Sequence, residues 1–95
     1  MLNKVFKKQD DIVSREIAGE SILVPIRGKL ADMQRIFSLD PVAEYIWRQL
    51  DGRRTLNEVS SGVLETFDVK KEQAEADLME FIDELLAAEL IAEVE

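Results

Sequence analysis

Two helix start signals stand close together in the middle of the chain, within Ser38–Val59, which reads SLDPVAEYIWRQLDGRRTLNEV. Asp40 can accept hydrogen bonds from the free N–H groups of a first helical turn, and Pro41 suits the first helical position. Thr55 and Glu58 form the Thr-x-x-Glu pattern of a capping box, which opens a second helix. The first of these helices is therefore short, and the fold is built from small elements.

Apolar residues follow both starts at helical spacing. The first stripe consists of Ala43, Ile46, Trp47 and Leu50. The second consists of Leu56, Val59, Val63 and Phe67. Gly52 is placed to end the first helix in a left-handed cap, and Trp47 is expected in the core because it lies on the apolar stripe. A third helix is expected from Lys70 to Ala88, with an apolar face made of Ala74, Leu78, Phe81, Ile82 and Leu85.

Extended segments precede these helices. Residues 11–26 alternate in the manner of a hairpin, with a turn at 18–21 in which Gly19 can take a positive φ. A loop follows, and residues 33–39 (MQRIFSL) return to extended geometry. Residues 1–10 show no clean period and are expected to form a flexible arm ahead of a domain over 11–95. The expected fold class is α+β, a winged-helix-like N-terminal three-stranded antiparallel sheet followed by three helices.

The amino-acid composition argues against catalysis by this chain. It has no cysteine and no histidine, so disulfides, thiolate metal sites and the commonest general base are missing. Ser60 and Ser61 have no histidine partner, and the four glycines are isolated rather than gathered in a phosphate-binding loop. The chain is therefore expected not to be an enzyme and to hold no metal or cofactor.

Charge is unevenly distributed along the chain. The net charge is −8, with +2 over residues 1–54 and −10 over residues 55–95. Helix-turn-helix proteins with a wing have a similar element order and often bind DNA, but an acidic third helix would be repelled by phosphates. Nucleic acid is thus not the expected partner. The acidic surface is interpreted as a solvated helix face, with a site for a basic partner as the alternative.

No apolar run approaches the roughly 18 residues that a membrane span needs, and no secretory signal opens the chain. No membrane partner is expected, and the expected location is cytoplasmic.

The run from Leu39 to Ile91 resembles the pyrroloquinoline quinone biosynthesis protein D (PqqD) family. Each matching motif is short, and their order carries the resemblance. The matching residues are Leu39, Asp40, Ala43, Ile46, Trp47, Asp51-Gly52-Arg53-Arg54-Thr55, Glu58-Val59, Glu75-Ala76-Asp77, Phe81 and Leu85-Leu86. The resemblance implies a recognition element for ribosomally made, post-translationally modified peptides.

Such domains bind the leader of a precursor peptide and present its core to a modifying enzyme, which is a radical S-adenosylmethionine protein in the founding pathway. The resemblance implies that the leader adds as a strand along the third strand, beside the third helix. The expected peptide-binding residues are Gln34, Arg35, Ile36, Phe37, Ser38, Gln73, Ala76, Asp77, Glu80 and Glu84. The acidic flank of the third helix would favour a basic leader.

Two alternatives remain at the level of the sequence. One is a winged-helix regulator that binds DNA, and the other is a structural subunit that completes an enzyme complex without a peptide site of its own. An open strand edge is compatible with a monomer or a dimer.

Overall fold

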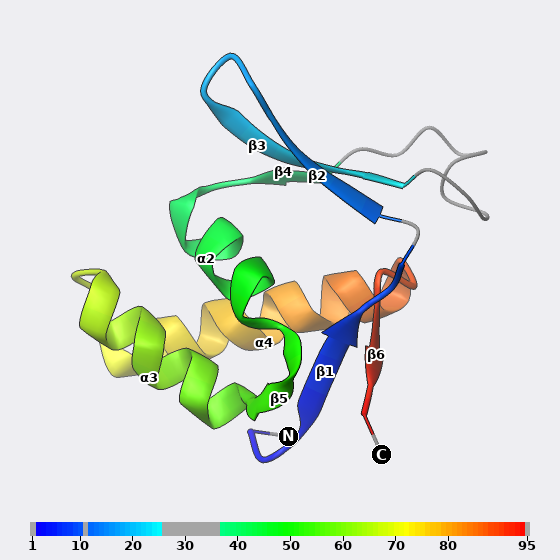
Figure 1. Ribbon diagram of the computed structural model, residues 1–95. Coiled ribbons are helices and arrows are strands. Elements are labelled where there is room, and N and C mark those ends of the chain that lie inside the picture. The colour runs from blue at the N-terminus through cyan, green and yellow to red at the C-terminus, as the bar shows by residue number, and fades with distance from the viewer. Residues whose placement is uncertain (1, 11, 26–36, 95) are drawn as a thin grey trace.

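The structure is a computed structural model that describes residues 2–10, 12–25 and 37–94 (Figure 1). Over these residues the fold is α+β, with three helices and two antiparallel sheets, which confirms the expected fold class. The elements are β1 (Val5–Lys8), β2 (Ile12–Ile17), β3 (Glu20–Pro25), β4 (Phe37–Leu39), α2 (Pro41–Gln49), β5 (Asp51–Thr55), α3 (Leu56–Thr66), α4 (Lys71–Ala87) and β6 (Ile91–Glu93).

The hairpin sheet contains the strands in the order β2-β3-β4 and lies at the top of Figure 1. Its hairpin turn is two residues long rather than the four expected over 18–21, because both Ala18 (φ 54°) and Gly19 (φ 83°) take positive φ angles. Such turns match the natural twist of two paired strands. Of the extended segment expected over residues 33–39, Phe37–Leu39 form β4, and residues 33–36 lie outside the described part of the chain.

The terminal sheet contains the strands in the order β5-β1-β6. The expectation of a flexible arm over residues 1–10 is wrong for Val5–Lys8, because this segment is the central strand β1, paired on one side with β5 and on the other with β6. Phe6 is 1% exposed and anchors the strand in the core. Val5–Lys8 therefore belong to the fold, and the described residues form a second sheet that the expectation of one three-stranded sheet did not include.

The caps of α2 and α3 follow the sequence pattern at the start of each helix. Asp40 Oδ1 accepts a hydrogen bond of 2.8 Å from the Ala43 N–H, and Thr55 and Glu58 exchange the two hydrogen bonds of a capping box. The end of α2 differs from the expected cap at Gly52, because the helix stops at Gln49 and Leu50 is its C-cap residue. Gly52 does take a positive φ of 81°, but it does so inside β5, where an added Cβ atom would lie 3.5 Å from Lys7 Cβ and 3.9 Å from Val94 Cγ2.

In Figure 1, α2 and α4 lie below the hairpin sheet, and α3 lies beside β5. Buried side chains of the three helices and of both sheets form one core cluster. The apolar stripes expected for the helices face this shared core, with Phe67 and Phe81 half-buried at its margin. Trp47 is 4% exposed, which confirms its expected place in the core. Among the described residues, no helix is long and apolar enough to cross a membrane.

Candidate functional site

A cleft of about 320 Å³ opens between β4, the N-terminal half of α2 and one flank of α4. It is lined by Phe37, Ser38, Asp40, Val42, Ala43, Ile46, Asp77, Glu80, Phe81 and Glu84. The first six of these residues come from one short stretch of chain, in which β4 leads directly into α2. The Asp40 cap makes this connection tight, because its side chain satisfies a free N–H of the first turn of α2.

Among the described strands, β4 is the edge of the hairpin sheet on the side of the cleft. In an antiparallel pair of strands, residue pairs that exchange main-chain hydrogen bonds alternate with pairs that do not. Ile17 and Glu20 flank the two-residue turn and therefore form a hydrogen-bonded pair. The alternation then turns the main-chain groups of Ser21 and Leu23 toward β4, opposite Leu39 and Phe37. The N–H and C=O of Ser38 consequently point away from β3, to the outer edge of the sheet.

The floor of the cleft is apolar and comes from both helices. Val42 and Ala43 of α2 and Phe81 of α4 are half-buried, and Ile46 is 1% exposed. The helical spacing of apolar residues predicts Ala43, Ile46 and Phe81 on the core stripes and gives no position for Val42. The sequence signal for these floor residues is a position at the edge of an apolar helix stripe. A residue at such a position has one side in the core and one side open to a groove.

The walls of the cleft carry negative charge. Asp40 contributes one carboxylate, and Asp77, Glu80 and Glu84 contribute three more from successive turns of α4. These side chains are spread along the cleft rather than convergent, and the described part of the chain has no group of three or more His, Cys, Asp or Glu residues arranged to hold a metal ion. The site is therefore an elongated acidic groove with an apolar floor and a strand edge on one side.

The structure brings together five of the residues expected to bind a peptide, namely Phe37, Ser38, Asp77, Glu80 and Glu84. Gln73 lies one turn before Asp77 and donates a hydrogen bond of 2.8 Å from Nε2 to its Oδ1. Ala76 lies elsewhere, in a shallow hollow lined also by Leu2, Asn3, Glu72, Glu75 and Met79. Gln34, Arg35 and Ile36 lie outside the described residues.

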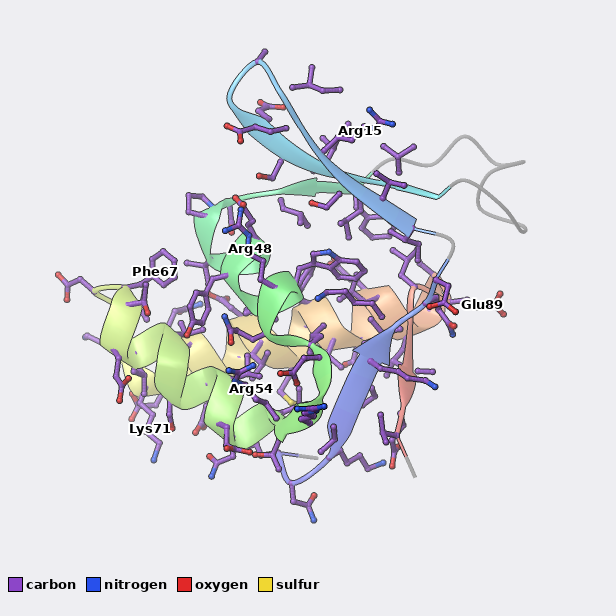
Figure 2. All side chains as sticks on the ribbon, viewed as in Figure 1. Arg15, Arg48, Arg54, Phe67, Lys71 and Glu89 are labelled. Carbon is purple, nitrogen blue, oxygen red and sulfur yellow. The ribbon has the colours of Figure 1, made fainter. Side chains whose placement is uncertain are left out.

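Two groups with displaced pKa values lie outside the cleft. Burial lowers the pKa of Lys8, and the nearby Asp51 carboxylate partly opposes this effect. Hydrogen bonds from the backbone N–H groups of Arg54 and Arg53 lower the pKa of the exposed Asp51 carboxyl. Figure 2 shows Arg54, which also forms an ion pair with Asp51. This local network stabilises the start of β5 and has no part in the cleft.

Comparison with known proteins gives a family match and a structural match. The sequence profile of coenzyme PQQ synthesis protein D (PqqD) matches residues 20–91. The fold is similar to that of TbiB1, solved in complex with the TbiA(beta) leader peptide, with a TM-score of 0.70 and 27% sequence identity over 90% of this chain and 93% of that chain. A search of curated proteins found no match.

Proposed function

This chain belongs to the coenzyme PQQ synthesis protein D family, and we propose that it binds the leader segment of a ribosomally made precursor peptide and presents that peptide to a modifying enzyme. The observation that carries the proposal is the acidic cleft beside the β4 edge, in a fold similar to that of a protein solved with a leader peptide. The chain itself is proposed to be non-catalytic.

The peptide binds by adding a strand to β4. Main-chain hydrogen bonds supply affinity in this mode, and pockets for alternate side chains supply specificity. The outward N–H and C=O of Ser38 are the groups that the added strand would bond, since the sheet register turns them away from β3. Side chains on one face of the added strand would then enter the cleft, above Val42, Ile46 and Phe81.

The modifying enzyme is proposed to be a radical S-adenosylmethionine protein. Enzymes with iron–sulfur clusters hold them through cysteine thiolates, and this chain contains no cysteine. The cluster and the chemistry would therefore reside in a separate protein. The role of this chain is to raise the local concentration of the precursor beside that enzyme.

The proposal is tested with a candidate leader, taken from a short reading frame sought beside the gene of this chain, made as a fluorescent peptide and titrated by fluorescence anisotropy. We expect micromolar affinity or better. Ser38→Pro removes the outward N–H, and proline is tolerated on an edge strand where the N–H faces outward. This variant should lose affinity by about tenfold or more, which corresponds to roughly 1.4 kcal/mol.

The matched control is Ser14→Pro, which makes the same substitution on the opposite edge of the same sheet. Ser14 pairs with Leu23 in β3, and the register turns its N–H to the outer edge of β2. This variant should bind as the unchanged chain does, and thermal melts should show both variants folded. Equal affinity of the Ser38→Pro variant and the unchanged chain would exclude strand addition at β4, and absence of any peptide binding would overturn the proposed function.

A further inference from the structure

We propose that the cleft selects peptides with two basic side chains at positions i and i+2, which pair with Glu80 and Glu84. The inference rests on the proposed function, because it assumes that an extended peptide lies along β4. It adds a chemical rule for the leader, and the rule follows from the spacing and the free charges of the cleft wall.

The strand register determines which peptide side chains enter the cleft. Phe37 and Leu39 turn their side chains to the core and are at most 9% exposed, while Ser38 between them turns outward and is exposed. Side chains of paired residues in neighbouring strands lie on the same face of a sheet. The peptide residue opposite Ser38 therefore points outward, and the residues on either side of it, which are two positions apart, point into the cleft.

Glu80 and Glu84 are the wall carboxylates that are available to a ligand. The Asp77 carboxylate accepts a hydrogen bond from Gln73, and the Asp40 carboxylate accepts one from the Ala43 N–H. The side chains of Glu80 and Glu84 are exposed and form no hydrogen bond or ion pair with another described residue. No Lys or Arg among the described residues lines the cleft.

The spacing of Glu80 and Glu84 along α4 matches the spacing of alternate side chains in an extended peptide. A helix rises about 1.5 Å per residue, so Glu80 and Glu84 are about 6 Å apart along the axis of α4. A strand rises about 3.4 Å per residue, so side chains at i and i+2 are about 6.8 Å apart. An extended peptide that runs along α4 can therefore present one basic side chain to each of the two glutamates.

The floor of the cleft favours long basic side chains over other cations. Lys and Arg can lay their methylene stems on apolar surface while the charged group remains in water. Phe81 lies next to Glu80 in the chain and contributes apolar surface to the same cleft as Glu84. Acidic peptide residues at the same positions would meet like charge, which costs affinity and excludes wrong partners.

The test uses an mRNA-displayed library of random twelve-residue peptides, selected on immobilised protein at low salt. We expect the unchanged chain to enrich peptides with Lys or Arg at two positions two apart, at least about tenfold over the unselected library. The Glu80→Lys/Glu84→Lys variant should lose this preference and enrich Asp or Glu at the same spacing.

The control variant is Asp83→Lys/Glu89→Lys, which changes the net charge from −8 to −4, as the cleft variant does. Asp83 is exposed on α4 and does not line the cleft, and Figure 2 shows Glu89 beyond the C-terminal end of that helix. This variant should keep the preference for paired basic residues. A preference lost equally in both variants would mean that only net charge matters, which overturns the inference.

The selection separates failure of the inference from failure of the proposed function. Enriched peptides that compete with one another for the unchanged chain but lack paired basic residues would overturn the rule and leave peptide binding at the cleft in place. If neither the unchanged chain nor any variant enriches a peptide, both the rule and the proposed function fall.

Discussion

The Ser21 hydroxyl of β3 donates a hydrogen bond of 2.7 Å to the Glu44 carboxylate of α2. The other oxygen of that carboxylate accepts from Arg48, one turn further along the helix. Ser21 is 9% exposed, so the bond lies at the margin of the core. It joins the hairpin sheet to the helix that provides part of the cleft floor, and it therefore helps to hold the β4 wall in position.

A double-mutant cycle with Ser21→Ala and Glu44→Ala should measure this connection. We expect a coupling free energy of about 1–2 kcal/mol in urea denaturation, because the acceptor is charged and partly buried. Arg48→Ala is the control, since the Arg48 side chain is 70% exposed and its ion pair with Glu44 should contribute less than about 0.5 kcal/mol. Additive effects of the Ser21 and Glu44 changes would contradict the expected link between sheet and helix.

Gly62 permits the close approach of α3 and α2. A Cβ atom at this position would overlap the Tyr45 hydroxyl and lie 3.1 Å from Tyr45 Cζ. Tyr45 in turn packs edge-on against Phe67, with ring centroids 5.7 Å apart, and Figure 2 shows Phe67 at the C-terminal end of α3. Replacing a helical glycine with alanine usually stabilises a helix by about 0.5–1 kcal/mol, but here we expect Gly62→Ala to destabilise the fold by about 1–3 kcal/mol.

The Tyr45→Phe background distinguishes steric overlap from other effects at Gly62. Tyr45→Phe removes the oxygen atom that the new Cβ would overlap, so Gly62→Ala should cost at least about 1 kcal/mol less in this background. The free energy of unfolding is measured by urea denaturation for all four proteins. A Gly62→Ala penalty that is the same in both backgrounds would show that the hydroxyl is not the cause.

Trp47→Ala should destabilise the fold by roughly 3–5 kcal/mol, because the indole is buried and its removal leaves a cavity. A loss of that size is a large part of the total stability of a domain such as this one. Far-UV circular dichroism is the appropriate measurement, since Trp47 is the single tryptophan and its fluorescence disappears with the mutation. Ile17→Thr, at a side chain that is 56% exposed, should change the melting temperature little. A Trp47→Ala melting temperature within a few degrees of the unchanged chain would contradict a core role.

Lys8 makes the free energy of unfolding depend on pH in the alkaline range. Its ammonium lies 5.6 Å from the centroid of the Trp47 ring, and burial lowers its pKa below the ordinary 10.5. The folded chain therefore releases this proton more readily than the unfolded chain, so the stability contribution of Lys8 rises as the pH increases from the lowered pKa to 10.5. At pH values below the lowered pKa, the desolvated Lys8 ammonium is charged and lowers the free energy of unfolding by its full amount.

Lys8→Met keeps the aliphatic stem and removes this titration. The free energy of unfolding of the Met variant minus that of the unchanged chain should be largest near neutral pH and should fall as the pH approaches 10.5. The difference between the two proteins cancels the other lysines, which titrate in both. A difference that grows with rising pH would contradict the inferred sign.

The elements that the sequence predicts well are those whose determinants lie within a few residues of one another. The Asp40 cap and the Thr55/Glu58 capping box are complete within four residues each, and both are present as expected. β1 was missed because its partners lie about fifty and ninety residues away in the chain, and the two lysines that follow Phe6 hide the alternation. Gly52 was misassigned for the same reason, since pairing with β1 draws it into a strand.

The cleft was partly predictable. Phe37, Ser38 and the acidic flank of α4 follow from the sequence pattern together with the family resemblance, and the structure brings them to one groove. Ala76 lies on a different flank from Asp77, because it precedes Asp77 by one residue and so lies about 100° around the helix, and its part in peptide binding stays a prediction. The inclusion of Ile46 and Phe81 depends on how far apart α2 and α4 pack, which helical periodicity does not specify.

The two walls of the cleft come from chain segments about forty residues apart, at 37–46 and 77–84, so the cleft exists only when the chain is folded. A peptide that occupies it binds the native state and not the unfolded state. At a free peptide concentration one hundred times the dissociation constant, linkage adds about 2.7 kcal/mol to the free energy of unfolding. Under the proposed function, the supply of precursor would thus change how much of this protein survives proteolysis, because an empty cleft leaves the chain with only its intrinsic stability.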